Sequence, residues 1–135
     1  IYEWINDEEV RKNSFQSDRI PYETHLNWFR NKMQDEKTKI YILMNNTSPV
    51  GQVRIERKNS MVHLSYLIEK NHRNKGYGVI ILQLMEEELM KEKSIKIIYA
   101  QVKKNNIASC HCFERCQYTK VEKKDYIEYV KDIKE

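Results

Sequence analysis

Two of the chain's three glycines stand two positions apart, at Gly76 and Gly78, where an alternating strand pattern changes into a helical one. The residues before them, Met61–Ile68, alternate between apolar and other side chains with the period of two that predicts a β-strand. The residues after them repeat every three to four positions, which predicts a helix. Glycine has no Cβ atom, so it lets the backbone approach a ligand closely. We therefore expect a ligand-binding loop at this junction.

The loop has the chemistry of a diphosphate cradle. The N-terminus of the following helix presents free N–H groups and a partial positive charge. Arg73 and Lys75 add two full positive charges. Two other phosphate-binding loops are excluded, because neither G-x-x-x-x-G-K-[ST] nor G-x-G-x-x-G occurs in the sequence. From these residues alone, a plain strand-to-helix turn remains the alternative.

Periodicity and turn residues predict a single α+β domain, residues 1–135, around one mixed sheet. The first three strands follow one another through short turns, so they should form an antiparallel meander. The long helix is a crossover, and we expect the strands on its two sides to be parallel. A strand before the first helix is expected to be missing from this chain. The expected helices are 6–12, 21–34, 76–92 and Ile107–Arg115, and the expected strands are Ile40–Met44, Val50–Glu56, Met61–Ile68, Ile95–Val102, Tyr118–Val121 and Tyr126–Val130.

Composition excludes several classes of protein. Charged residues make up 33% of the chain and hydrophobic residues 40%, which is typical of a soluble globular domain. The net charge of +4 is small, and the basic residues are scattered along the chain, so we expect no nucleic-acid partner. No apolar run approaches the ~20 residues that span a bilayer, and there is no signal-peptide pattern. We expect a cytoplasmic protein without a membrane partner.

Three cysteines lie close together at Cys110, Cys112 and Cys116, with His111 between the first two. An odd number of cysteines in a short chain favours a reducing compartment. The spacing C-H-C-x-x-x-C has no second ligand pair elsewhere, so we expect no metal site. The cysteines are instead interpreted as small apolar residues on a helix.

Two blocks of sequence resemble the GNAT acyltransferases. The motif Arg73-x-x-Gly76-x-Gly78, with Ile68 five residues before it, resembles the family's [QR]-x-x-G-x-[GA] signature. A second block agrees with the family pattern V…N-x-x-[SA]-x-x-x-[YF]-[EK]…G-[FY], and the resemblance covers nearly the whole chain. The matching residues of the second block are Val102, Asn106, Ser109, Phe113, Glu114 and Tyr118.

This resemblance implies acetyl-CoA as the co-substrate. The end of the third strand should pair with the pantetheine arm, the glycine loop should wrap the pyrophosphate, and Asn106 should hydrogen-bond the pantetheine. Phe113 stands where the family often has a tyrosine that protonates the leaving thiolate, and phenylalanine has no proton to give. Gln117 replaces a common glycine. The implied cofactor-binding residues are Leu67, Ile68, Arg73, Asn74, Lys75, Gly76, Tyr77, Gly78, Asn106, Ser109 and Phe113.

The N-terminal half and the strand Val50–Glu56 are similar to a particular branch of the family. Trp4-x-Asn6-Asp7 and Gly51-Gln52-Val53-Arg54 resemble the UDP-amino-sugar N-acetyltransferases of pseudaminic- and legionaminic-type pathways. A nucleotide-sugar site needs aromatic rings for the base and polar groups for hydroxyls and phosphates. The candidate acceptor-binding residues are Phe15, Tyr22, His25, Gln52 and Arg54. Two alternatives stay open: an acetyltransferase of protein N-termini, which also opens with W-x-N-D, and an inactive acyl-CoA-binding module.

Acetyl transfer needs a neutral amine, so a base should lie beside the thioester. His63 shares a strand face with Ser65 and Leu67, at a position where relatives often carry glutamate. Neutral histidine can accept the proton near neutral pH, and the N–H near Leu67 can stabilise the negative charge that develops on the acetyl oxygen. His63 and Leu67 are the candidate catalytic residues. An ordinary polar residue on a half-exposed strand is the alternative for His63, and a homodimer is left open.

Overall fold

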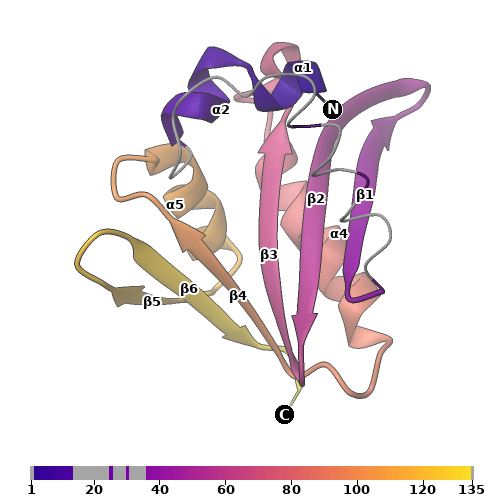
Figure 1. The fold of residues 1–135 in the computed structure, drawn as a ribbon, viewed down its shortest axis with the longest axis vertical. Coiled ribbons are helices and arrows are strands. Elements are labelled where there is room, and N and C mark those ends of the chain that lie inside the picture. The colour runs from indigo at the N-terminus through magenta and orange to yellow at the C-terminus, as the bar shows by residue number, and fades with distance from the viewer. Residues whose placement is uncertain (1, 14–24, 26–29, 31–35, 135) are drawn as a thin grey trace.

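The computed structural model describes residues 2–13, 25, 30 and 36–134, and within these ranges the strands form one six-stranded mixed sheet (Figure 1). The strand order is β1-β2-β3-β4-β6-β5. The elements are α1 Tyr2–Ile5, α2 Glu8–Asn13, β1 Thr38–Asn45, β2 Ser48–Lys58, β3 Met61–Ile68, the 3₁₀ turn η1 Lys70–His72, α4 Tyr77–Met90, β4 Ile97–Val102, α5 Ile107–Arg115, β5 Thr119–Glu122 and β6 Ile127–Asp132.

The sheet topology confirms the expected pairing. Strands β1, β2 and β3 form an antiparallel meander, and β3 pairs in parallel with β4 across the helix α4 that joins them. The hairpin β5–β6 is also present, with β6 inserted between β5 and β4. The bounds of β3 and α5 are those predicted, whereas β1 and β2 extend beyond their predicted ends.

Strands β3 and β4 separate at their carboxyl ends (Figure 1). Among the described strands, their register covers three positions, from Met61 opposite Ile97 to His63 opposite Tyr99. Beyond His63, β3 continues to pair with β2 on its other side. Backbone N–H and C=O groups require partners when they are buried. The diverging edge of β3 therefore presents hydrogen-bonding groups to whatever enters between the two strands.

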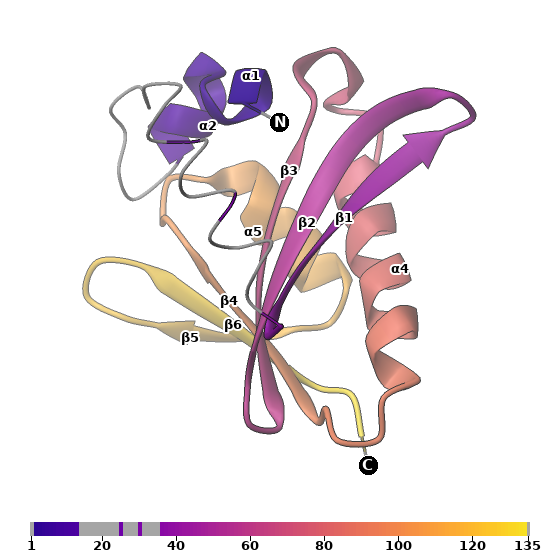
Figure 2. The same ribbon diagram turned by 45° about the vertical axis from the view of Figure 1, so that its right-hand side comes forward.

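Helices α4 and α5 lie together on one face of the sheet (Figure 2). Their apolar sides pack on the strand face that carries Val53, Ile55, Val62 and Leu64, each at most 1% exposed. Fully burying an aliphatic side chain stabilises the fold by roughly 1.5–3 kcal/mol, so this layer fixes the sheet against the helices. The helical repeat predicted after the glycines, Val79, Leu82, Met85 and Leu89, is confirmed on one side of α4: the last three are buried and Val79 is partly buried. Ile81 is buried as well.

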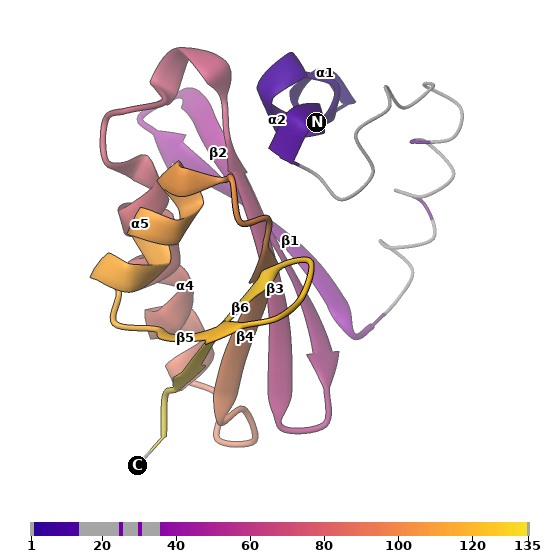
Figure 3. The same cartoon turned by 90° about the vertical axis from the view of Figure 1, so that its left-hand side faces the viewer.

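The short helices α1 and α2 lie near the carboxyl end of β3 (Figure 3). Helix α2 confirms the predicted helix start, because the Asp7 carboxylate accepts hydrogen bonds from the N–H groups of Glu9 and Val10 at 3.1 and 3.3 Å. Helix α1 has only four residues, which is too short to show periodicity. The predicted helix 21–34 falls outside the described residues except at His25 and Arg30, where the backbone is helical.

Two backbone positions depend on particular residues. Gly51 lies opposite Ile68, and a Cβ atom there would stand 2.8 Å from the Leu67 carbonyl oxygen. Strands β2 and β3 are therefore in close contact at this point, and the contact restricts the position of the Leu67 backbone.

Gln117 has a φ of 66° and follows α5 in a turn where the N–H of Tyr118 donates to the Phe113 carbonyl. This left-handed conformation explains why glycine suits the position.

Candidate functional site

The loop between β3 and α4 is held by its own side chains. The Glu69 carboxylate accepts hydrogen bonds from the N–H of Asn71 at 2.9 Å and contacts Nδ1 of His72 at 2.6 Å, which closes the turn η1. Asn74 and Gly76 then adopt left-handed backbone conformations, with φ of 62° and 85°. Asparagine and glycine are the residues that tolerate this region most readily. The sequence therefore turns sharply into α4 at this point.

The two glycines of the loop meet different requirements. Gly76 needs its left-handed φ, and apart from its immediate surroundings in the chain no atom of the described residues lies within 4 Å of where its Cβ would be. Gly78 needs space, because a Cβ atom there would stand 2.6 Å from Sγ of Cys112 and 3.3 Å from the hydroxyl of Tyr66. From the sequence, both glycines are expected to allow close approach of a ligand. The structure adds a packing reason for Gly78, which lets α4 approach α5.

A cavity of about 350 Å³ lies between the end of β3, the first turn of α4 and the start of α5. On the strand side it is lined by Tyr66, Leu67 and Ile68, at the end of β3 that has diverged from β4. Most of the residues predicted to bind the cofactor line it, while Lys75 is exposed in the same loop and is not among the lining residues. The predicted residues that line the cavity are Leu67, Ile68, Arg73, Asn74, Gly76, Tyr77, Gly78, Asn106 and Ser109.

Two helix N-termini border this cavity. Gly76 is the N-cap of α4 and has no side chain that could satisfy the first N–H groups of the helix, so these donors are suited to an anion. Asn106 is the N-cap of α5, and its side-chain oxygen accepts a hydrogen bond from the N–H of Ser109 at 3.3 Å. The arrangement offers backbone donors at one end of the cavity and the free edge of β3 along its side. Both features fit a pyrophosphate joined to an extended amide-containing arm.

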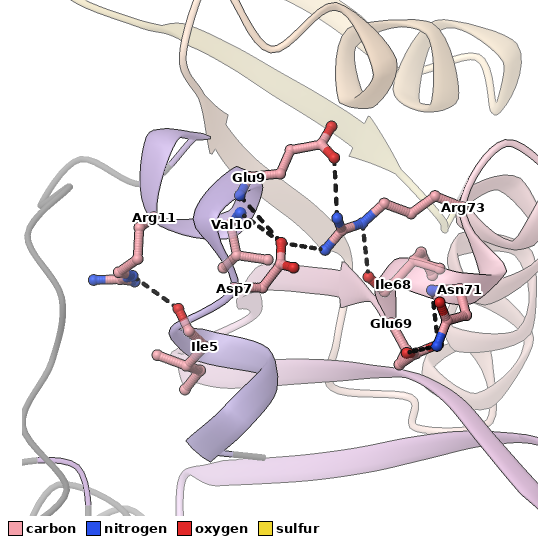
Figure 4. Close-up of polar contacts among 9 residues, drawn as sticks. All are labelled: Ile5, Asp7, Glu9, Val10, Arg11, Ile68, Glu69, Asn71 and Arg73. Carbon is pink, nitrogen blue, oxygen red and sulfur yellow. Dashed lines mark hydrogen bonds and ion pairs between the residues drawn. The ribbon is translucent and has the colours of Figure 1, made fainter.

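The Arg73 side chain is engaged by protein oxygens (Figure 4). Its Nε donates to the Ile68 carbonyl at 3.1 Å, and its two terminal nitrogens donate to Glu9 at 3.0 Å and to Asp7 at 2.8 Å. From the sequence, this arginine is expected to face the diphosphate as a free positive charge. In the structure, the arginine borders the cavity while all three guanidinium nitrogens have protein acceptors.

Phe113 lies in the core, 2% exposed, with its ring stacked on Tyr129 and edge-on to Tyr118. Tyr66 lines the cavity instead, and its ring meets Phe113 edge-on at 5.9 Å. The Tyr66 hydroxyl donates to Oγ of Ser109 at 3.2 Å. Burial raises the pKa of Tyr66 well above its usual range, so the phenol stays protonated. Tyr66 is not among the site residues predicted from the sequence, and its hydroxyl, on an otherwise apolar strand face, is the signal that could have pointed to the cavity.

The opposite face of the sheet carries a polar row across β2 and β3. Side chains directly opposite each other on antiparallel strands share a face, and the register sets Gln52 opposite Leu67 and Arg54 opposite Ser65. Glu56 and His63 form the next pair, and His63 stacks on Tyr99 of β4 with ring centroids 5.0 Å apart. The residues of the polar row are Gln52, Arg54, Glu56, His63 and Ser65. The predicted base and two predicted acceptor-binding residues thus share one face of the sheet, with Gln52 directly opposite Leu67 and His63 four residues earlier in β3.

Burial shapes the chemistry of this polar row. Gln52 is 5% exposed, and its Oε1 atom has no hydrogen-bond donor among the described residues. An unsatisfied buried acceptor costs about 1–3 kcal/mol, so the atom is suited to accept from an external donor. Burial lowers the pKa of His63, Arg54 and Lys58 lower it further, and Glu56 and Glu128 oppose them only in part. His63 is therefore more fully neutral near pH 7 than an exposed histidine.

The remaining predicted acceptor residues are only partly described. Phe15 and Tyr22 lie outside the described residues. His25 is 6% exposed, with its ring centroid 5.7 Å from that of Tyr2, and burial lowers its pKa. The structure therefore brings His25 against α1, and its role in binding the acceptor stays a prediction.

The cysteines behave as apolar residues. Cys110 and Cys116 are free thiols buried in the core, and Cys112 is half-buried against the cavity. Over the described ranges, no three His, Cys, Asp or Glu side chains come together in a way that could hold a metal ion. Nor does any helix in the described part of the chain have the length and apolarity to cross a membrane.

Comparison with known proteins gives one family and several similar structures. The sequence profile of the Acetyltransferase (GNAT) family matches residues 1–118. Among curated protein sequences, no significant match was found. A domain from Methanocaldococcus jannaschii is 24% identical with a TM-score of 0.84, covering 97% of this chain and 88% of that one.

Two further structures share the fold at lower identity. AAC(6')-Ib in complex with paromomycin and acetyl-CoA is 16% identical with a TM-score of 0.83, covering 97% of this chain and 85% of that one. The Campylobacter jejuni N-acetyltransferase PseH is 17% identical with a TM-score of 0.72, covering 82% and 79%. At these identities the likeness establishes the fold.

A substitution at Gly76 tests the diphosphate cradle. Aspartate and asparagine have nearly the same shape and both tolerate a left-handed backbone, but aspartate sets a negative charge at the mouth of the anion site. Gly76→Asp should weaken acetyl-CoA binding by roughly a hundredfold or more, since like charges a few ångströms apart repel by several kcal/mol. Gly76→Asn should retain most of the affinity. Isothermal titration calorimetry measures both, and equal affinities for the two folded variants would contradict the assignment.

Proposed function

The chain belongs to the GNAT acetyltransferase family, and from that premise we propose that it moves the acetyl group of acetyl-CoA to the primary amine of a UDP-linked deoxyamino sugar. As a member of the family it is an acyl-CoA-dependent N-acetyltransferase. The proposal concerns the acceptor, the residues that hold it and the group that takes its proton. Both substrates are cytoplasmic metabolites, so we propose that the protein acts in the cytoplasm.

The observation that carries the proposal is the polar row on β2 and β3, beside the strand end that borders the acyl-CoA cavity. Its most buried member, Gln52, has an acceptor oxygen that no donor in the described part of the chain satisfies. A sugar offers hydroxyl and amine donors at fixed angles, and a buried oxygen rejects ligands that lack a matching donor. This supports a polyhydroxylated amine over an apolar one.

Arg54 supports a phosphate-bearing acceptor. Its side chain is 26% exposed on the same face, with Nε 3.3 Å from a Glu56 carboxylate oxygen. A guanidinium presents five donors in a planar fork, so it can keep one carboxylate contact and still hydrogen-bond a phosphate oxygen. In the proposed complex, Gln52 hydrogen-bonds the sugar and Arg54 contacts the diphosphate of UDP. The aromatic partners for uracil, Phe15 and Tyr22, remain predictions from the sequence.

The proposed reaction is a direct attack with both substrates bound. The amine nitrogen forms a bond to the acetyl carbon, the carbon–sulfur bond breaks, and CoA leaves as a thiolate that takes up a proton. An alkylammonium has a pKa near 10.4, so the attacking amine must first lose a proton. A backbone N–H near Leu67, at the end of β3, is proposed to stabilise the charge on the acetyl oxygen. Because the N–H of Glu69 donates to Val50 of β2 and the directions of backbone groups alternate along a strand, the N–H groups that face away from β2 here are those of Tyr66 and Ile68.

His63 is the proposed base. It lies on the polar row, two residues from Ser65 along the same strand face, and burial keeps it neutral near pH 7. A neutral imidazole can accept the amine proton directly or through one water. Its stacking on Tyr99 fixes the orientation of the ring.

A panel of acceptors tests the proposed function. Release of CoA thiol is measured with acetyl-CoA and UDP-linked deoxyamino sugars, the same sugars without UDP, peptides with a free N-terminus, and spermidine. The UDP-sugars should give the highest kcat/KM. In Arg54→Gln, the KM for the UDP-sugar should rise by about tenfold while the KM for acetyl-CoA stays unchanged, and the rise should vanish for the sugar without UDP. Preferred turnover of peptides would establish an N-terminal acetyltransferase instead, and no turnover of any amine would favour the acyl-CoA-binding module.

Substitution of His63 tests the base. His63→Gln keeps a polar side chain of similar size but cannot accept a proton at neutral pH, so kcat should fall by roughly 10²-fold or more. Because its pKa is lowered, protonation should reduce kcat/KM of the unaltered enzyme only below about pH 6.5, and this acidic limb should disappear in the variant. Stopped-assay rates across pH 5–9 give both readings. A variant with unchanged kcat and an unchanged acidic limb would show that His63 is not the base.

A further inference from the structure

The guanidinium of Arg73 joins two segments that are far apart in the sequence (Figure 4). One of its contacts is local, to the carbonyl of Ile68 at the end of β3. The other two reach Glu9 and Asp7, which precede it by 64 and 66 positions. One side chain of the glycine loop therefore connects the strand that borders the acyl-CoA cavity to the start of α2.

Asp7 has two structural tasks. Its Oδ2 atom accepts the N–H groups of Glu9 and Val10, which caps α2, and the same atom accepts Arg73 at 2.8 Å. Burial raises the pKa of this carboxyl, but the bonds from Arg73 and from the Val10 and Glu9 backbone outweigh that effect, and the pKa lies below its ordinary value. Asp7 is therefore ionised at neutral pH, and the ion pair with Arg73 is complete.

Helix α2 forms part of the wall of the acyl-CoA cavity. Glu9 and Val10, in its first turn, line the same cavity as Gly76 and Asn106. Arg73 also borders a second cavity of about 580 Å³, on the side of Asp7 and α1. The Arg73–Asp7 pair thus lies between the two cavities. The Arg73 side chain is 21% exposed and the Asp7 side chain is 17% exposed. Partial burial of this kind makes a charge-assisted pair more sensitive to the loss of either partner than a surface pair is.

We propose that Arg73 and Asp7 are positioning residues for acyl-CoA: the pair holds the first turn of α2 as a wall of the cavity, and Arg73 affects acyl-CoA affinity through Asp7 and not by direct contact with the diphosphate. The anion is then met by the N–H groups of α4 and by the exposed Lys75. This inference rests on the use of acetyl-CoA and is independent of the proposed acceptor.

A double-mutant cycle separates the proposal from its alternatives. Asp7→Asn keeps a side-chain oxygen for the cap, since asparagine caps helices about as well as aspartate, and removes only the charge that pairs with Arg73. Arg73→Gln removes the other partner. Each variant should weaken acetyl-CoA binding by about five- to tenfold, and the double variant should be no weaker than either single one, because residues that act as one unit are not additive. Calorimetry without an acceptor gives the affinities.

The sign of the Asp7→Asn effect decides between mechanisms. If Arg73 were a diphosphate ligand, Asp7→Asn would release it and remove a competing negative charge, so affinity would stay the same or rise while Arg73→Gln lowered it. If the pair served only stability, both variants would lower the melting temperature and leave the affinity, measured well below melting, unchanged. Either result overturns the proposal. Because calorimetry contains no acceptor, a failure here leaves the acceptor assignment untouched.

Two further readings complete the test. Glu88→Gln breaks an exposed ion pair with Lys91 on α4, where the side chains are 47% and 73% exposed, and should leave acetyl-CoA affinity unchanged as a charge-matched control. In steady-state assays with any accepted amine, Asp7→Asn should raise the KM for acetyl-CoA with kcat within about twofold of the unaltered enzyme. A fall in kcat with an unchanged KM would place the pair in the chemical step and contradict a positioning role.

Discussion

Strands β3 and β4 share a parallel register from Met61 to His63 and then diverge. This divergence leaves one edge of β3 without a strand partner among the described residues, next to a cavity that two helix N-termini border. Unpaired strand edges readily accept an extended ligand as an additional strand, and helix N-termini accept anions. Acyl-CoA has an extended arm and a diphosphate, and the backbone groups at this place are of the two kinds that suit them.

The same divergence organises the two faces of the sheet. On the helix side, Gly78 allows α4 to approach Cys112 of α5, and the core closes beneath the cavity. On the other side, the polar row follows β2 and β3 toward Leu67, whose backbone is held by the close approach of Gly51. A thioester between the strands would be reached by an amine from the polar face. In the proposed complex, the acyl donor and the acceptor approach from different sides and meet at the carboxyl end of β3.

The sequence predicted the strands and helices that bury one face. In β3 apolar side chains alternate with others, and in α4 Leu82, Met85 and Leu89 recur at helical spacing, and in both elements these apolar positions are the buried ones. It predicted the glycine loop through a pattern that is local along the chain. Long-range contacts were missed: the acid partners of Arg73, the Cys112 contact that requires Gly78, and the entry of Tyr66 into the cavity each depend on segments far apart in sequence. The spacing of apolar side chains along an element predicts which of its faces is buried, but it does not identify the residues that pack against that face.

Amide hydrogen exchange tests most directly the claim that the free edge of β3 receives acyl-CoA. Exchange is followed by nuclear magnetic resonance with and without acetyl-CoA. We predict that acetyl-CoA slows exchange at the N–H groups of residues 64–68 that point away from β2, and at the first turn of α4, while amides shared between β1 and β2 keep their rates. Unchanged exchange at both places in a sample shown to bind acetyl-CoA would contradict the account and place the ligand elsewhere on the protein.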